Sequence, residues 1–216
     1  MNVILKNGDA LAVEDGATCA KAASAISEGL ARNAVAAKVN GVLCDLSHIL
    51  NEGDKLEIVT LKDKEGLEVY RHTCAHVLAQ AVKTIFPTCK LAIGPVIENG
   101  FYYDFDFNTP ISQDDFAKIE AEMAKIIKAN TPITRFELPR EEAIKLMSDY
   151  KEKYKVELIN DLPEDSVISF YKQGSFTDLC RGPHLPSTGK IKAFKLVSIA
   201  GAYWRGNEKN KMLTRI

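Results

Sequence analysis

Three of the four histidines of this 216-residue chain lie in two short motifs that could form one reaction centre. The first motif is His72-Thr73-Cys74-Ala75-His76, and the second is Cys180-Arg181-Gly182-Pro183-His184. In a helix, His72 and His76 would lie one turn apart on the same face. Because imidazole exchanges protons near neutral pH and binds metal ions as thiolate does, the two motifs could act together on one substrate.

The residue types of the two motifs allow several kinds of site. The histidine pair with Cys180 and His184 is a ligand set for tetrahedral zinc, closed with four ligands and hydrolytic with three. Without metal, the same groups would carry protons around an ester while Asp178 fixes a tautomer or binds a hydroxyl group. A Cys180–histidine nucleophile pair and a purely structural packing role are further alternatives. The motifs alone do not choose among them.

The first motif lies in a stretch whose apolar residues recur at spacings of three and four, as in an amphipathic helix. The apolar stripe consists of Leu67, Tyr70, Cys74, Val77, Leu78, Ala81 and Ile85. His72 and His76 lie off this stripe on the opposite face, and Pro87 ends the helix. The second motif is expected to follow a strand, with Gly-Pro presenting Cys180 and His184 rigidly at the edge of a site.

The first 61 residues predict a small domain. Apolar segments 2–6 and 10–13 flank the turn signal Asn7-Gly8-Asp9, which predicts a β-hairpin. The other predicted elements are a helix over 19–28 between Thr18 and Gly29, a strand over 35–39, a turn at Asn40-Gly41 and a strand over 55–61.

Residues 62–216 predict a second, larger domain. Its elements after the histidine helix are a hairpin of 91–98 with 101–107, a helix over 112–129, a strand over 132–138, a helix over 140–154, and strands over 167–171 and 193–199. Helices and strands mix without strict alternation, so we expect an α+β fold.

Charge and composition limit the class of protein. The net charge is −1, yet residues 179–216 hold eight basic residues against one acidic residue, which would attract a polyanion such as nucleic acid. No apolar run is long enough to cross a bilayer, and the N-terminus lacks the pattern of a secretion signal. The five cysteines do not form the spacing of a disulfide framework. We therefore expect a cytoplasmic protein.

Three segments together resemble the N-terminal half of bacterial threonyl-tRNA synthetases. They are the His-x-x-x-His helix, Gly-Ser-Phe-Thr-Asp-Leu-Cys-Arg-Gly-Pro-His at 174–184 and Gly-Ala-Tyr-Trp-Arg-Gly at 201–206. The resemblance spans the chain and implies a ubiquitin-like β-grasp (TGS-like) domain over 1–61 followed by a tRNA editing domain over 62–216. Alanyl-tRNA synthetases and alanyl editing proteins have a related pattern, but the domain order favours the threonyl family.

The resemblance implies an aminoacyl-tRNA deacylase that hydrolyses serine wrongly attached to threonine tRNA. Its implied catalytic residues are His72, Lys155 and Cys180, and its implied substrate-binding residues are His76, Tyr103, Asp178 and His184. The resemblance implies an editing pocket that works without bound metal or another cofactor, unlike that of the alanyl relatives. The ATP, magnesium and zinc of the full-length family would belong to a catalytic domain expected to be absent here. The expected partner is the acceptor end of tRNA(Thr), with no membrane, and family homodimers form mainly through the absent region.

Two rival functions remain open at this stage. An alanyl-type, zinc-dependent trans-editing deacylase would require stoichiometric zinc. A non-catalytic module that binds RNA or a protein partner would bind without hydrolysing an ester.

Overall fold

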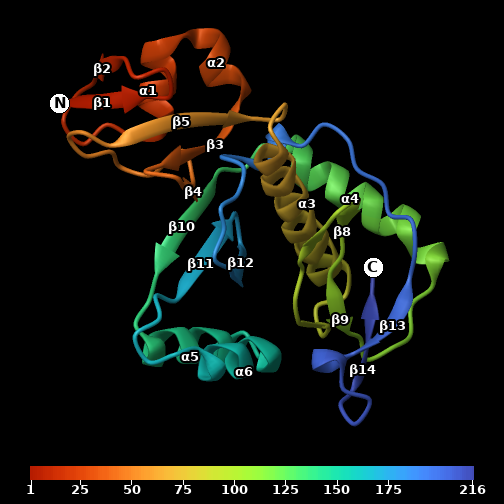
Figure 1. Cartoon of the computed structure of the whole chain (residues 1–216). Helices are drawn as coiled ribbons and strands as arrows, with labels where there is room; N and C mark the ends of the chain where they lie inside the picture. Colours follow the sequence, from red (N-terminus) through yellow and green to blue (C-terminus); the bar gives the residue numbers. More distant parts are fainter. The chain divides into compact units, whose positions relative to one another are not determined.

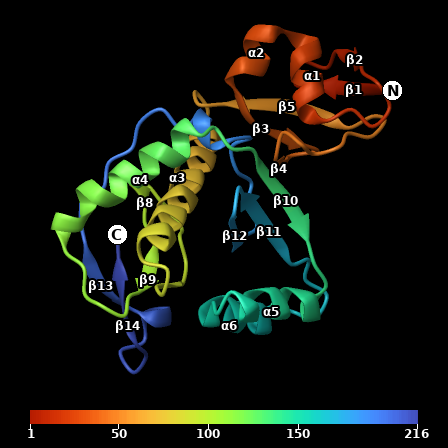
Figure 2. The same cartoon turned by 180° about the vertical axis from the view of Figure 1, so that it is seen from behind.

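The computed structural model describes all 216 residues, which divide into two compact units. Unit 1 consists of Met1–Thr73 with Gly182–Pro186, and unit 2 consists of Cys74–Arg181 with Ser187–Ile216. The division passes through helix α3 (Lys64–Ile85), which is labelled in Figures 1 and 2. The domain boundary after residue 61 stays a prediction.

Unit 1 contains a five-stranded sheet in the order β2-β1-β5-β3-β4, with β1 and β5 parallel (Figure 1). Its strands are β1 (Asn2–Leu5), β2 (Ala10–Ala12), β3 (Ala34–Val39), β4 (Val42–Cys44) and β5 (Lys55–Thr60). Buried Val3 and Leu56 of the sheet belong to the same apolar core as the alanines of α1 (Cys19–Ile26). The prediction of a ubiquitin-like domain at the N-terminus is confirmed.

The helical segment of unit 1 differs from the prediction at its end. Thr18 caps α1 as expected, by accepting a hydrogen bond from the Lys21 N–H. Gly29 does not end the helix, because Ser27 is already extended and caps a second helix, α2 (Glu28–Asn33). Ser27 does so by accepting from the Leu30 N–H at 3.1 Å.

Helix α3 is confirmed over 22 residues, but its burial differs from that of a simple amphipathic helix. Leu67, assigned to the apolar stripe, is 42% exposed, whereas His76 on the opposite face is only 3% exposed. The middle of α3 is thus covered on more than one side. Neither α3 nor any other helix of the structure has both the length and the apolar character needed to cross a membrane.

Unit 2 has three antiparallel sheets, ordered β13-β14-β9-β6, β10-β11-β12 and β7-β8. Their strands are β6 (Lys90–Leu91), β7 (Val96–Ile97), β8 (Gly100–Phe101), β9 (Asp104–Asp106), β10 (Ile133–Glu137), β11 (Ser169–Gln173), β12 (Phe176–Leu179), β13 (Ala200–Tyr203) and β14 (Met212–Arg215). The helices are α4 (Phe116–Lys128), α5 (Arg140–Asp149) and α6 (Lys153–Asp161), with 3-10 turns at Gln113–Asp115, Thr188–Lys190 and Trp204–Gly206. Helices and sheets mix without alternation, which confirms the α+β class.

Two predicted elements of unit 2 are wrong. Residues 193–199 form no strand, since the Leu196 N–H bonds to the Glu120 carboxylate at 2.9 Å instead of a neighbouring strand. The helix expected over 140–154 is two helices, α5 and α6, separated at Lys151, whose φ is +59°. The break places Lys155 inside α6, not beyond the end of a helix.

Glu152 explains where α6 begins. Glu152 is only 3% exposed, and its side chain joins two other segments, with Oε1 2.7 Å from Lys83 Nζ and Oε2 accepting from the Leu91 N–H at 2.8 Å. Its carbonyl oxygen then accepts from the Lys155 N–H at 3.0 Å. Lys155 is therefore positioned one turn after a residue that is fixed by buried polar contacts.

Candidate functional site

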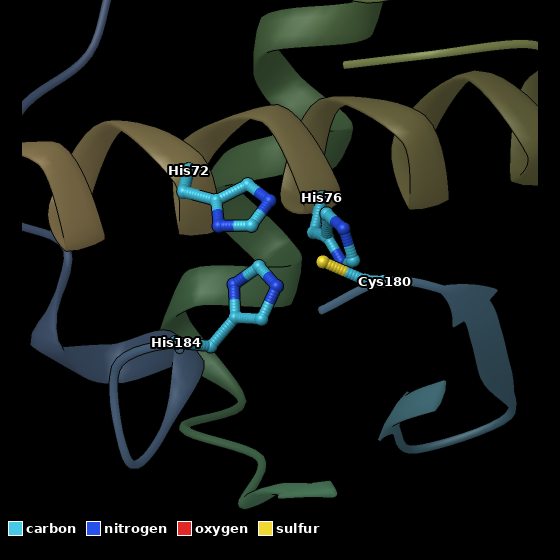
Figure 3. Close-up of side chains that lie close together, drawn as sticks. All are labelled: His72, His76, Cys180 and His184. Carbon is cyan, nitrogen blue, oxygen red and sulfur yellow. The ribbon is translucent and has the colours of Figure 1, made fainter. Parts of the chain in front are cut away.

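Four side chains from the two histidine motifs converge. Figure 3 shows His72 and His76 leaving successive turns of α3, with the His184 ring facing His72 and the Cys180 sulfur next to His76. The metal-ligating atoms of these four residues all lie within 4.8 Å of one another. The sequence prediction that the two motifs meet is borne out by this geometry. Three imidazoles and a thiol at such distances also suit a zinc ion by the chemistry of their donor atoms.

The second motif reaches the site because it leaves an ordered strand and then turns sharply. Cys180 follows β12 directly, and its N–H donates to the Ser169 carbonyl at 3.0 Å. Gly182 has a φ of +73°, a left-handed conformation that side chains with a Cβ rarely adopt. This turn carries the chain to His184, whose side chain is 1% exposed. The expectation that the motif follows a strand is confirmed.

Thr73 fixes the orientation of the His184 ring. The Thr73 hydroxyl donates to the Val69 carbonyl at 2.9 Å and accepts from the Leu185 N–H at 3.0 Å. His184 Nδ1 lies 3.1 Å from the same oxygen. When the Thr73 hydroxyl donates its one proton to Val69, Nδ1 carries the proton of this third bond. Neutral His184 consequently has its lone pair on Nε2.

The His72 ring lies against this oriented imidazole. The centroids of the His72 and His184 rings are 4.2 Å apart, with 30° between their planes. His72 is half-buried, whereas His184 is almost completely buried. The site therefore has one imidazole with partial access to solvent and one whose tautomer is set by the protein.

We expect Thr73→Val to remove the preference of neutral His184 for one tautomer without leaving a cavity, because valine keeps the shape of threonine but lacks its hydroxyl. Loss of these buried hydrogen bonds should cost about 1–3 kcal/mol of unfolding free energy. Long-range ¹H–¹⁵N NMR spectra should then show a mixture of the two neutral tautomers of His184. Thr73→Ser, which retains the hydroxyl, is the control, and a pure Nδ1–H tautomer in the valine variant would refute this account.

A second group of site residues surrounds Asp178. Asp178, in β12, is 1% exposed, and Lys155, in α6, is 3% exposed. Lys155 Nζ lies 2.7 Å from Asp178 Oδ1, and the Tyr103 hydroxyl donates to Asp178 Oδ2 at 2.6 Å. Lys155 Nζ also donates to the Tyr103 oxygen at 2.9 Å. The three residues form a closed, buried triangle of polar contacts.

His76 belongs to both groups of side chains. Its ligating nitrogen is part of the cluster with His72, Cys180 and His184, and its Nε2 lies 3.8 Å from Asp178 Oδ2. The Phe176 ring packs against it edge to face at 6.4 Å between centroids. His76 thus lies next to both the Asp178 carboxylate and the other members of the histidine cluster.

The electrostatics of the triangle favour an ionised Asp178. Burial would raise the pKa of Asp178, but the charges of Lys155 and His76, with the hydrogen bonds from Lys155 and Tyr103, outweigh it and lower the pKa below 3.8. Burial, followed by the neighbouring Asp178 charge, raises the pKa of Tyr103 well above 10. Tyr103 therefore stays a neutral donor while Asp178 stays a carboxylate.

Gly94 lies directly against the Tyr103 ring, where a larger residue would not fit. A Cβ atom at position 94 would lie 2.2 Å from Tyr103 Cδ2, so the ring could not keep its place. We expect Gly94→Ala to lower the free energy of unfolding by about 1–3 kcal/mol through overpacking and to shift the Tyr103 hydroxyl away from Asp178. Urea unfolding of this variant and of Gly100→Ala, whose Cβ would meet nothing within 4 Å, provides the test. Equal stability of the two variants would contradict it.

All seven residues predicted for the site have now been placed. Two groups contain them: the cluster of His72, His76, Cys180 and His184, and the triangle of Tyr103, Lys155 and Asp178. Sequence reasoning missed Thr73, Gly94 and Glu152, which hold these side chains in position. Only Thr73 left a signal, as a polar residue between the two histidines of the helix motif.

Two family models match the chain. The TGS domain matches residues 1–60, and the model described as "Threonyl and Alanyl tRNA synthetase second additional domain" matches residues 168–216. The second match includes Asp178, Cys180 and His184 and extends to Ile216.

Curated relatives match over the whole chain. Proteins named threonine–tRNA ligase from Clostridium tetani, Clostridioides difficile and Acetivibrio thermocellus are each 59% identical to it over 216 residues. These matches cover 100% of this chain and 34% of each relative, so the chain spans about a third of the relatives' length. The chain is thus a homologue of bacterial threonine–tRNA ligases, with a TGS domain followed by the second additional domain of threonyl- and alanyl-tRNA synthetases.

Proposed function

We propose that this chain is the editing part of a threonyl-tRNA synthetase and hydrolyses the ester of seryl-tRNA(Thr). The observation that carries the proposal is the convergence of three imidazoles and a thiol beside a buried lysine–carboxylate pair. Such a site supplies a base, hydrogen-bond donors and a fixed negative charge, the groups that ester hydrolysis needs. The similarity to proteins named threonine–tRNA ligase supports threonine tRNA as the tRNA of the substrate.

In the proposed reaction, water attacks the carbonyl carbon of the seryl ester and gives up a proton to His72. His72 suits this step because it is the imidazole of the adjacent pair with partial access to solvent. His184 would hold the water through the lone pair on Nε2. The C–O bond to the ribose then breaks, and the proton passes from His72 to the departing ribose oxygen. The products are serine and the free tRNA hydroxyl.

Lys155 and Asp178 serve binding and charge stabilisation in this proposal. Paired with Asp178 at 2.7 Å, Lys155 is a donor, and it would hydrogen-bond the oxyanion that forms at the carbonyl. Asp178 has further lone pairs for the amino group of serine or a ribose hydroxyl, while Tyr103 holds it in place. His76 and Cys180 would complete the pocket wall.

A second hydrolytic site has a physical reason in this family. Serine lacks one methyl group of threonine, and a missing methylene changes binding by only about 1–3 kcal/mol, so a synthetic site cannot reject serine well by size. The proposed pocket would accept the seryl ester and misplace or exclude the larger threonyl ester.

The proposed partner is the acceptor end of tRNA(Thr), in the cytoplasm. The segment 179–216 supports this, since its eight basic residues against one acidic residue begin beside Cys180. Contacts of this kind with phosphate weaken as salt rises.

The test is hydrolysis of seryl-tRNA(Thr) and threonyl-tRNA(Thr) by protein stripped of metal with a chelator. Selective loss of serine without metal supports the proposal. Hydrolysis that appears only with one equivalent of zinc would support the alanyl-type deacylase, which the donor set of the cluster also fits. Binding of tRNA without hydrolysis under either condition would leave the RNA-binding module as the function.

A further inference from the structure

The loop that carries His184 is held by a residue of the N-terminal domain. The His184 N–H donates to Asp45 Oδ1 at 2.9 Å, across 139 positions of sequence. Asp45 and the loop Gly182–Pro186 both belong to unit 1. This contact lies outside the groups that the proposed reaction uses.

Asp45 itself is fixed from both sides. It directly follows β4, where Cys44 pairs with Ala37 of β3. The next residue, Leu46, is 7% exposed in the core of the N-terminal sheet domain, and its carbonyl accepts from the Ala20 N–H at 2.8 Å. The Asp45 carbonyl accepts from the His48 N–H at 3.0 Å. The carboxylate therefore projects from a turn that the domain core holds in place.

Side chains accept hydrogen bonds from the backbone of the His184 loop. It forms no strand or helix, and two consecutive N–H groups, those of His184 and Leu185, bond to Asp45 and Thr73. A hydrogen bond to a charged acceptor is stronger than one between neutral groups. Asp45 thus fixes the backbone of His184 while Thr73 fixes its ring.

We propose that Asp45 is a positioning residue for His184, so that the TGS domain is a working part of the hydrolytic site. Without the Asp45 contact, the backbone N–H of His184 would lose its charged acceptor. A displacement of about 1 Å at a reacting group can cost on the order of 10²-fold in rate, so a partial loosening of this loop should be visible in catalysis. The catalytic consequence rests on the proposed function, whereas the anchoring of the loop does not.

The experiment compares Asp45→Ala, Asp45→Asn and Glu52→Ala in the full chain. Asparagine keeps an oxygen that can accept from the His184 N–H. Glu52 is the matched control, because its carboxylate accepts from the Asn2 N–H at 2.8 Å in the same domain, away from the loop. The readouts are the amide hydrogen-exchange rate of His184 by NMR, and kcat and KM for seryl-tRNA(Thr).

In Asp45→Ala, we expect the His184 amide to exchange at least about tenfold faster and kcat to fall about tenfold, with KM within about twofold. Asp45→Asn should stay within about threefold of the wild type in both measurements, and Glu52→Ala should match the wild type. An unchanged exchange rate in Asp45→Ala would overturn the proposal, as would faster exchange with unchanged kcat. If the wild-type chain hydrolyses neither ester, the proposed function fails, and the exchange rates alone decide whether Asp45 anchors His184.

Discussion

Lys155→Ala is expected to lower the free energy of unfolding by about 3–5 kcal/mol at pH 7, the usual cost of removing one partner of a buried ion pair. The reason is that Asp178, only 1% exposed, would keep the Tyr103 hydrogen bond but lose the cation 2.7 Å away. Urea unfolding followed by circular dichroism measures this change. The same variant should lose most of its seryl-tRNA hydrolysis, because the proposed pocket would lose both the Lys155 hydrogen-bond donor and the side chain that fills this place.

The cost of Lys155→Ala should depend on pH in a defined direction. In the wild type, the lowered pKa of Asp178 means that its stabilisation is present above pH 3.8 and is lost as pH falls through the folded-state pKa. In the variant, burial is no longer outweighed by Lys155, so the folded state should favour protonated Asp178. The stability difference between the two proteins should be largest at neutral pH and narrow below about pH 4.

Two further variants separate the buried charge from other effects. Lys153→Ala removes a lysine two residues earlier whose partner, Asp106, keeps Lys211 and the Tyr154 hydroxyl. It should cost less than Lys155→Ala, because Lys153 is half-exposed and the buried Asp106 keeps two other partners. Adding Asp178→Asn to Lys155→Ala should recover part of the lost stability. A Lys155→Ala protein as stable as Lys153→Ala at pH 7 would show that the pair is not energetically coupled.

His72→Ala is expected to reduce kcat for seryl-tRNA(Thr) by about 10²–10⁴-fold, the range that a general base contributes. Because His72 is half-buried and its site neighbours are held by Thr73 and the Asp178 triangle, its loss should change the free energy of unfolding little. Single-turnover hydrolysis with purified mischarged tRNA, at several pH values, measures the effect.

His48→Ala is the matched control for this measurement. His48 is exposed in the N-terminal domain and is the one histidine outside the two motifs. Its replacement should leave kcat within about twofold of the wild type, as expected for a surface substitution away from the site. A His72→Ala rate equal to that of His48→Ala would remove His72 from the reaction and leave another group as the base.

The parts of the fold that follow from local sequence were predictable. The spacing of apolar residues predicted α3, and Asn40-Gly41 predicted the turn between β3 and β4, where both residues have positive φ. The meeting of the two histidine motifs also followed, since the residue types themselves indicate a shared site. Local patterns therefore predicted helix α3, this turn and the convergence of the two histidine motifs.

The positions that depend on distant contacts were not predictable in the same way. The start of α6, and with it the place of Lys155, depends on Glu152 bonding to Lys83 and to Leu91, which are 69 and 61 positions away. No local pattern contains that information. His76 likewise is buried beside Phe176 of β12, which lies far along the chain and packs where the helix pattern indicated an open face.

The hydrogen bonds of Thr73 restrict how protons can travel through the site. With the Thr73 proton donated to Val69, Nδ1 of His184 keeps its own proton on the Thr73 oxygen in both the neutral and the charged ring. Any proton that His184 gains or releases must therefore use Nε2. A proton and a zinc ion would then compete for one and the same lone pair, so acidity itself would weaken metal binding at this nitrogen.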